Sequence, residues 1–250
     1  IFNNQMKGYF MSDKLYIVMP AYNEAANIVD TLTEWYPVVE KIGNDSRLVV
    51  VNDGSKDNTL SLMEEFAKTH PLFVPVSKKN SGHGGTVLFA YKYALDNGAD
   101  FVFQTDTDGQ TRPEEFWQFW KLRNEFDMVI GHRIGRQDGI SRVIVTKTLR
   151  AVVRLRFGVN IPDANTPFRL MNAGSLRENI KYIPKDFNLS NVLLSVIYFK
   201  KGQKVKFIPI TFKPRQGGVN SINLKSIFRI GKKALQDFKS LNIRLDKELN

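Results

Sequence analysis

The chain has 250 residues, of which 42% are hydrophobic, 24% are charged and none is cysteine. This length and apolar content suffice for one buried core and exclude a disordered chain, and the lack of cysteine excludes disulfides and thiolate metal sites. The formal net charge of +11 is concentrated near the C-terminus, because residues 200–250 contain 13 Lys or Arg and 3 Asp or Glu. A basic end favours contact with an anionic surface, and a solvated charged face is the equally weighted alternative.

Hydropathy gives no membrane-spanning segment. The longest apolar stretch near the C-terminus runs from Val192 to Phe199, well short of the ~20 residues that a membrane helix needs. The amino terminus lacks a signal-peptide pattern, so we expect a cytoplasmic protein, peripheral at the inner face of the plasma membrane if its basic end binds lipid. Residues 1–12 show no periodicity and are expected to be an N-terminal extension, with Met11 as a candidate start.

Short apolar runs alternate with amphipathic segments through the first half of the chain, which predicts βαβ units and a parallel sheet. Their nearly continuous apolar character is typical of strands covered on both faces. The predicted strands are Leu15 to Met19, Leu48 to Val51, Leu72 to Val76, Phe101 to Gln104 and Met128 to Ile130.

The alternation ends near Arg133, after which a Gly-, Arg- and Asp-rich stretch forms either an active-site loop or a plain surface connection. The pattern then predicts helices at 143–157 and 189–199, a strand at 205–210 and a terminal helix from about residue 222. This last helix is amphipathic and basic. It either lies in a membrane interface or packs on the sheet with its charges in water, and the second interpretation is slightly favoured.

Polar segments follow four of the predicted strands. Ligands of parallel α/β sheets bind beyond the carboxyl ends of the strands, so these segments are expected to meet there, although each alone is also an ordinary turn or helix cap. The segments are Pro20-Ala21-Tyr22-Asn23-Glu24, Asn52-Asp53-Gly54-Ser55, Asn80 to Thr86, and Thr105 to Gln110. The third opens a helix but has neither the dinucleotide-binding nor the P-loop spacing, which counts against NAD and ATP as ligands.

Asp106 and Asp108 occupy alternate positions directly after an apolar strand, so both carboxylates can face one cation. A hard divalent ion, Mg²⁺ or Mn²⁺, fits oxygen ligands and would neutralise a nucleotide diphosphate. An Asp-rich turn with a permissive Gly109 is the alternative, and it is favoured when the motif is taken alone. On the same edge, Asp53 is expected to accept hydrogen bonds from a nucleobase and the Tyr22 ring to support that base.

In this order, the segments resemble the family 2 glycosyltransferases of GT-A fold, most closely their polyprenyl-phosphate sugar transferase branch, which includes dolichol-phosphate mannose synthase. The likeness runs from Leu15 to about Phe238 and includes Gly131-His132-Arg133, Asp163 with Phe168-Arg169-Leu170-Met171, and Arg215 with Gly218 and Ser221. It implies an α/β, Rossmann-like domain at 13–241 with a mostly parallel sheet flanked by helices. Its parts would be a nucleotide-sugar-binding half at 13–131, an acceptor half at 132–221, a basic amphipathic helix at 222–241 and a tail at 242–250.

The resemblance also implies inverting, metal-dependent transfer from a UDP- or GDP-sugar to a polyprenyl phosphate or lipid-linked saccharide in cell-envelope glycan synthesis, with no nucleic-acid partner. The implied metal ligands are Asp106, Asp108 and Gln110. The implied catalytic residues are Asp163, Asp108 and Arg169, with Asp163 as general base for a hydroxyl acceptor or as a positioning group for a lipid phosphate. Donor-binding residues would be Pro20, Tyr22, Glu24, Asp53, Ser55, Gly82, Gly85, Asp106, Arg133 and Arg215.

The sequence departs from the family pattern at Asn52, where an acid is usual, at His132, where a small residue is common, and at Thr166-Pro167, where Gly is frequent before Phe168. Many members also have C-terminal membrane helices. Three alternatives stay open: transfer to a soluble saccharide, a sugar-1-phosphate nucleotidyltransferase, and a non-catalytic module for anionic lipid or nucleic acid. The missing N-terminal Gly-rich phosphate loop counts against the nucleotidyltransferase.

Overall fold

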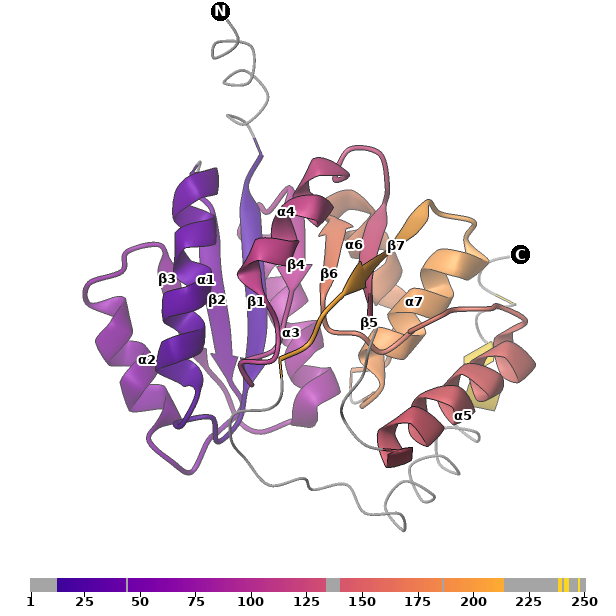
Figure 1. Ribbon diagram of the computed structural model, residues 1–250, viewed down its shortest axis with the longest axis horizontal. Coiled ribbons are helices and arrows are strands. Elements are labelled where there is room, and N and C mark those ends of the chain that lie inside the picture. The colour runs from indigo at the N-terminus through magenta and orange to yellow at the C-terminus, as the bar shows by residue number, and fades with distance from the viewer. Residues whose placement is uncertain are drawn as a thin grey trace, which may run out of the picture.

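The computed structural model describes residues 13–43, 45–133, 140–185, 187–213, 238–239, 241–242 and 247. The expected N-terminal extension at 1–12, the Gly- and Arg-rich stretch at 135–139 and most of the expected helix at 222–241 lie outside this part. Figure 1 shows one central sheet with helices packed on both sides. Among the described residues, no helix combines the length and apolarity needed to cross a bilayer.

The sheet has seven strands in the order β3-β2-β1-β4-β6-β5-β7. Strand β6 is antiparallel to its neighbours β4 and β5, and all other neighbouring pairs are parallel. The strands are β1 (Leu15–Ala21), β2 (Arg47–Asn52), β3 (Phe73–Ser77), β4 (Phe101–Gln104), β5 (Met128–Arg133), β6 (Arg169–Asn172) and β7 (Val205–Ile210). The mostly parallel α/β sheet predicted from the sequence is confirmed, and β6 is an addition to that prediction.

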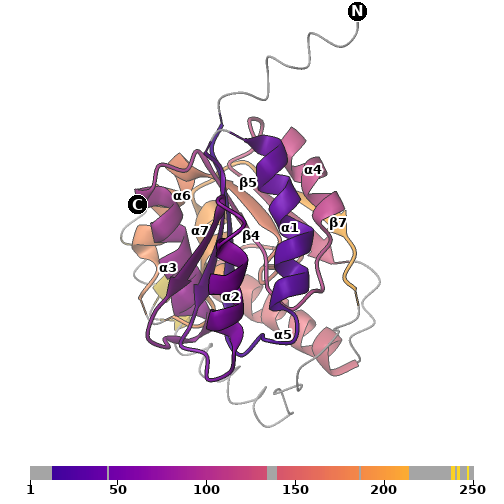
Figure 2. The same ribbon diagram turned by 90° about the vertical axis from the view of Figure 1, so that its left-hand side faces the viewer.

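The helices form two layers around the sheet. Figure 2 shows α1, α2 and α4 toward one side and α3, α6 and α7 toward the other. The helices are α1 (Ile28–Ile42), α2 (Thr59–Ala67), α3 (Gly82–Asp96), α4 (Pro113–Lys121), α5 (Ile140–Phe157), α6 (Ala173–Asn179) and α7 (Ser190–Lys200), with a 3₁₀ turn at Ile180–Tyr182. Pro113 is tolerated at the start of α4 because the first turn of a helix leaves its N–H groups unpaired anyway.

Alternate side chains of each central strand enter opposite cores. In β1, Ile17 and Met19 pack with Trp35 of α1, whereas Tyr16 and Val18 pack on the opposite face. All five are buried, which explains why the strand sequence is apolar at every position rather than at every second one. Burial of each large apolar side chain contributes about 1.5–3 kcal/mol, so the two cores fix the position of the strand ends.

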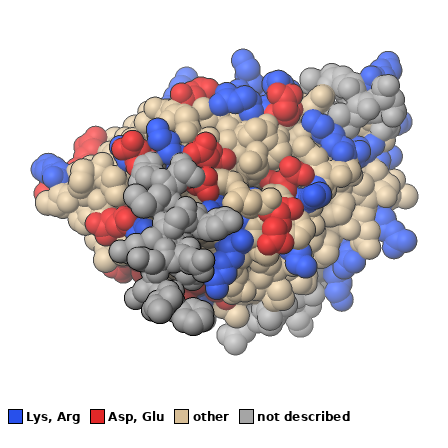
Figure 3. Space-filling view, turned by 90° about the horizontal axis from the view of Figure 1, so that it is seen from above, with Lys and Arg blue, Asp and Glu red and all other residues tan. Residues whose placement is uncertain are grey.

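The chain order creates a switch point at the centre of the sheet. Strands β1, β2 and β3 are laid outward from the centre, and the chain then crosses back to place β4 on the other side of β1. Connections after β1 and β4 therefore leave in opposite directions and open a crevice at their carboxyl ends, the lower edge of the sheet in Figure 1. Because β6 runs the other way, the loop that precedes it reaches this same edge. The upper edge carries basic and acidic side chains side by side over its middle (Figure 3).

Candidate active site

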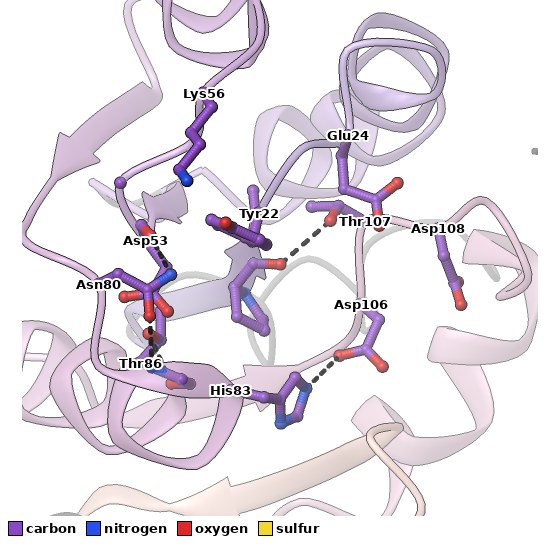
Figure 4. A pocket seen from close by; sticks show the side chains of 14 residues that line it. Tyr22, Glu24, Asp53, Lys56, Asn80, His83, Thr86, Asp106, Thr107 and Asp108 are labelled. Atoms are coloured by element: carbon purple, nitrogen blue, oxygen red, sulfur yellow. Dashed lines mark hydrogen bonds and ion pairs between the residues drawn. The ribbon is translucent and has the colours of Figure 1, made fainter. Parts of the chain in front are cut away.

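A cavity of about 680 Å³ lies at the switch point, at the carboxyl ends of β1, β2 and β4 and the start of α3. It is lined by Pro20, Ala21, Tyr22, Glu24, Asp53, Gly54, Lys56, Asn80, Gly82, His83, Thr86, Asp106, Thr107 and Asp108. Figure 4 shows these side chains converging from four separate connections. The four polar segments singled out in the sequence thus meet at one site.

Hydrogen bonds brace the first two segments against each other. Asn23 N donates to Ser55 Oγ (3.0 Å), and Lys56 N donates to Asn23 Oδ1 (2.8 Å). Asn23 has a φ of 55°, a left-handed conformation that Asn tolerates better than most residues. The predicted donor-binding residue Ser55 therefore uses its hydroxyl oxygen in this pair of hydrogen bonds. Tyr22, the residue before Asn23, is 44% exposed and lines the cavity.

Asn52 organises the turn after β2. Its side-chain nitrogen donates to Ser77 Oγ (3.0 Å), and its side-chain oxygen accepts from Ser55 N (3.1 Å). An ionised carboxylate only accepts hydrogen bonds, so an aspartate here could not make the bond to Ser77 in the same way. The amide at this position, where the family usually has an acid, therefore has a local structural explanation.

The Asp53 carboxylate is buried and already paired. Its Oδ1 forms an ion pair with Lys78 Nζ and accepts a hydrogen bond from Ser81 N (2.8 Å). Burial opposes ionisation, but these bonds outweigh it and hold the pKa of Asp53 below its ordinary value. Asn80 Nδ2 donates to Asp53 O (2.8 Å), which ties the third segment to the second. Asp53 is thus an ionised, fixed acceptor at the cavity wall.

The glycines of the third segment have different structural roles. Gly82 lines the cavity with a φ of +77°, where only glycine is unstrained. A Cβ on Gly84 would lie 2.2 Å from Phe187 O, so this position admits no side chain. A Cβ on Gly85 would meet Ser81 Oγ at 2.7 Å, although Gly85 is not part of the cavity wall. The glycines allow the start of α3 to pack beneath the loop before α7, with its first N–H groups near the cavity.

Asp106 and His83 lie side by side at the cavity wall (Figure 4), with His83 Nε2 3.4 Å from Asp106 Oδ1. Partial burial disfavours a charge on the imidazole, but the carboxylates of Asp106, Asp108 and Asp53 outweigh this effect and raise the pKa of His83. The imidazole stands within hydrogen-bonding distance of a carboxylate at the cavity wall. His83 was not among the predicted site residues, since a histidine in a Gly-rich segment gives no sign of its position until the start of α3 is known.

Asp108 and Gln110 close the loop after β4. Asp108 Oδ1 accepts from Gln110 N (3.1 Å), the bond typical of an Asx turn, and Gly109 follows with a φ of 70°. The predicted third metal ligand, Gln110, is 5% exposed and is not part of the cavity wall. Its Nε2 donates to Lys213 O (3.2 Å), and its backbone oxygen accepts from Lys213 N (2.8 Å). Gln110 thus joins this loop to the segment that follows β7.

Arg133 and Asp163, predicted as separate functional residues, form one ion pair. Arg133 Nε and Nη2 donate to the two oxygens of Asp163, both at 2.8 Å, and the side chains are 14% and 5% exposed. Arg133 ends β5, whereas Asp163 lies in the loop before the reversed strand β6. The pair therefore joins the connection after β5 to the loop before β6 and lies outside the wall of the large cavity.

Arg169 is fully buried beneath that loop. Its guanidinium donates to the backbone oxygens of Ala164 (3.2 Å), Thr166 (3.0 Å from Nε) and Asn191 (3.1 Å). Burial lowers the pKa of this guanidinium from its ordinary value. These contacts fix the loop that carries Asp163, so any effect of Arg169 on the reaction passes through that loop.

Of the other predicted residues, Pro20, Tyr22, Glu24 and Asp106 line the cavity, and Arg215 lies outside the described residues. Besides His83, two lysines were not predicted: Lys56, which lines the cavity, and Lys78, which pairs with Asp53. Both follow strand ends, but a lysine there is more often a solvated surface residue.

Comparison with known proteins gives the family. Residues 16–242 match Glycosyl transferase family 2. The chain belongs to this family. It is therefore a glycosyltransferase, and the resemblance to the polyprenyl-phosphate branch is supported by the following two relatives.

The family 2 chain is 25% identical to an undecaprenyl-phosphate mannosyltransferase of Micrococcus luteus over 215 residues, which cover 82% of this chain and 86% of that protein. It is 27% identical over 151 residues to an undecaprenyl-phosphate 4-deoxy-4-formamido-L-arabinose transferase of Pectobacterium atrosepticum; the match covers 59% of this chain and 45% of that relative. The chain thus spans less than half the length of the second relative.

A solved structure confirms the GT-A fold. The glucosyl-3-phosphoglycerate synthase of Mycobacterium tuberculosis superposes with a TM-score of 0.69 at 16% identity, covering 92% of this chain and 80% of that one. That crystal contains Mn²⁺, UDP-glucose and phosphoglyceric acid.

Proposed function

We propose that this glycosyltransferase moves a sugar from a nucleotide-sugar donor, with inversion and with the help of a divalent metal, to a polyprenyl phosphate or a lipid-linked saccharide. The main support is that Asp53, the start of α3 and the pair Asp106 and Asp108 all line one cavity at the switch point of the sheet. The acceptor class is supported by the names of the two relatives, both of which are undecaprenyl-phosphate transferases.

On the donor side, the cavity separates the groups that hold a base from those that hold phosphates. Asp53, kept ionised by Lys78, offers a fixed acceptor to a nucleobase, and the exposed Tyr22 ring offers an apolar face for it. The N–H groups that begin α3 favour the negative charge of a diphosphate, and the His83 ring lines the same part of the cavity. The donor would therefore lie with its base toward β2 and its diphosphate between α3 and the loop after β4.

The residues present fit a divalent metal. Asp106 and Asp108 supply hard carboxylate oxygens to the same cavity, and Mg²⁺ typically takes only one or two protein carboxylates beside substrate phosphates. Within the described residues, no cluster of three or more acidic, histidine or cysteine side chains is arranged to hold a metal, so the donor would complete the ligand shell. A bound Mg²⁺ or Mn²⁺ would act as a Lewis acid on the departing diphosphate.

On the acceptor side, the Arg133 guanidinium is held in place by Asp163, and the planar fork of N–H donors in a guanidinium suits the oxygens of a phosphate. We infer that Arg133 binds the phosphate of the acceptor and that Asp163 orients Arg133. For a hydroxyl acceptor, Asp163 would exchange its bond to Arg133 for one to the attacking hydroxyl and take its proton. Because a polyprenyl phosphate is a membrane lipid, we place the reaction at the inner face of the plasma membrane.

The test is transfer from radiolabelled UDP- and GDP-sugars to undecaprenyl phosphate in detergent, with Mg²⁺, Mn²⁺ or EDTA. We expect one donor class to give a labelled lipid and to release the nucleoside diphosphate. Release of pyrophosphate would identify a nucleotidyltransferase instead, and labelling of a soluble saccharide alone would exclude the lipid acceptor.

The variant Asp108→Asn tests the metal assignment. We expect calorimetry to show loss of Mn²⁺-dependent donor binding with unchanged thermal unfolding, because this half-buried loop residue contributes little to the core. Asp45→Asn is the matched control, since Asp45 lies in the turn before β2, at the opposite edge of the sheet, and its φ of 59° suits asparagine. Donor affinity equal to that of the parent chain in Asp108→Asn would refute the assignment.

A further inference from the structure

One face of helix α5 is turned to solvent. We call the side chains of Lys147, Thr148, Ala151, Arg154 and Leu155 the α5 outer face, because all five are exposed and their spacing places them on one stripe of the helix. Leu155 is 78% exposed, compared with at most 44% for any other exposed large apolar residue among those described. The opposite side of α5 is anchored in the core through Val153 and Phe157.

The charge of this helix has one sign. Residues 140–157 contain five basic residues, Arg142, Lys147, Arg150, Arg154 and Arg156, and no Asp or Glu. The upper edge of the molecule differs, because acidic and basic groups alternate over its middle (Figure 3). An uninterrupted positive field on α5 therefore attracts an anionic partner.

The helix connects the two residues of the acceptor side. It follows the strand that ends with Arg133 and leads into the loop that carries Asp163, and these two residues are paired. In Figures 1 and 2, α5 lies at the lower end of the molecule, where the strands β1 to β5 end. A surface that docks on α5 would therefore come close to the Arg133–Asp163 pair.

We propose that the α5 outer face docks on an anionic lipid bilayer, with Leu155 inserted among the lipid chains and Lys147 and Arg154 at the headgroups. The combination of basic side chains with an exposed leucine favours a lipid bilayer over other anionic partners. Cations alone suit any polyanion, but an apolar side chain between them gains free energy only where it can contact hydrocarbon. This inference rests on the proposed lipid acceptor for its purpose, since docking would bring the acceptor phosphate to Arg133.

The same observations separate α5 from the basic C-terminal segment. Phe238, which belongs to the basic amphipathic helix expected at 222–241, is fully buried between Phe157 of α5 and Phe187, at ring distances of 5.2 and 5.9 Å. Its aromatic ring supports α5 from inside and does not reach lipid. Leu155, on the opposite side of α5, carries the apolar contact.

Direct contact is tested with a fluorophore. The sequence has no cysteine, so Leu155→Cys can be labelled at one position with an environment-sensitive dye. We expect a blue shift and stronger emission with phosphatidylglycerol-containing vesicles and no change with pure phosphatidylcholine. Lys204→Cys, an exposed position at the start of β7 and at the opposite edge, is the matched control and should not respond. An unresponsive Leu155→Cys label on vesicle-bound protein, or an equal response to double-stranded DNA, overturns the proposal.

Charge reversal tests the energetics. Each Lys or Arg near an anionic surface changes partitioning about fivefold, so Lys147→Glu with Arg154→Glu should weaken sedimentation with anionic vesicles by about 25-fold or more. Lys204→Glu with Lys206→Glu makes the same change of net charge elsewhere and should weaken it only a few-fold. Equal loss in both double variants would show that net charge alone is responsible and would overturn the proposal.

Transfer assays keep this proposal distinct from the proposed function. We expect the Lys147→Glu/Arg154→Glu variant to match the parent chain with undecaprenyl phosphate in detergent micelles and to lose transfer at least tenfold when the lipid is in anionic vesicles. No transfer by the parent chain in micelles would refute the proposed acceptor and leave the docking measurements standing. Normal transfer in vesicles by the double variant would refute the docking proposal and leave the proposed function unaffected.

Discussion

Replacement of Asp163 by asparagine separates the structural role of the Arg133–Asp163 ion pair from its proposed catalytic role. Both oxygens of Asp163 accept hydrogen bonds from Arg133 at 2.8 Å, and the two side chains are only 5% and 14% exposed. Exposed pairs are worth about 0–1 kcal/mol, and removal of one partner from a buried pair costs about 3–5 kcal/mol. Since this pair is nearly buried, we expect a loss of about 3 kcal/mol, which lowers the Tm by about 6–12 °C for a chain of this size.

The kinetic effect should exceed the effect on donor binding. We expect Asp163→Asn to lower kcat by ~100-fold or more, as for the loss of a general base or of the residue that orients the acceptor, with UDP affinity within a few-fold. Assays are run at 15 °C, where the destabilised variant is still folded. If Arg133 and Asp163 act as a unit, Arg133→Gln in the Asp163→Asn background adds little further loss. Transfer by Asp163→Asn within a few-fold of the parent chain would refute this reasoning.

Three further variants test residues that support the site from outside the cavity wall. Gly84→Ala should destabilise the chain by about 1–3 kcal/mol in thermal unfolding, because the new Cβ would lie 2.2 Å from Phe187 O. The lowered pKa of Asp53 stabilises the fold above about pH 4, and this contribution is lost as pH falls through the folded-state pKa. Lys78→Met raises that folded-state pKa, so the urea midpoint of the variant should be lower than that of the parent chain throughout about pH 4 to 7. Equal midpoints in the two chains would contradict the ion pair. Arg169→Lys should reduce transfer with donor affinity within a few-fold, because lysine cannot bond the same carbonyl groups; an equal loss of both would place Arg169 nearer the donor.

The sequence predicted the parallel half of the sheet because its strands are apolar at every position. That signal arises from burial on both faces and is therefore visible locally, as in Leu15 to Met19 and Leu48 to Val51. Strand β6 has only four residues and begins with the buried Arg169, which donates to carbonyl groups of the preceding loop and of α7. No local pattern reveals such a strand, because its stability comes from β4 and β5 on either side.

Site residues were predictable where their position follows directly from a strand end. Asp53 and Asp106 are of this kind, and both line the cavity. The pairing of Arg133 with Asp163 spans 30 positions and depends on the reversal of β6, which sequence spacing does not encode. Gln110 was assigned by resemblance as a metal ligand, and its bond to Lys213 across 103 positions is likewise set by tertiary contacts.

The reversed strand β6 also makes the acceptor side a separable module. The excursion that contains α5 leaves the sheet at the carboxyl end of β5 and returns at the amino end of β6, so it starts and finishes at the same edge. Its length and composition can change without altering the register of any strand, and a longer connection costs only about 0.6 kcal/mol per doubling. Under the proposed function, exchange of this excursion between family members would therefore change the acceptor and leave the proposed nucleotide cavity intact.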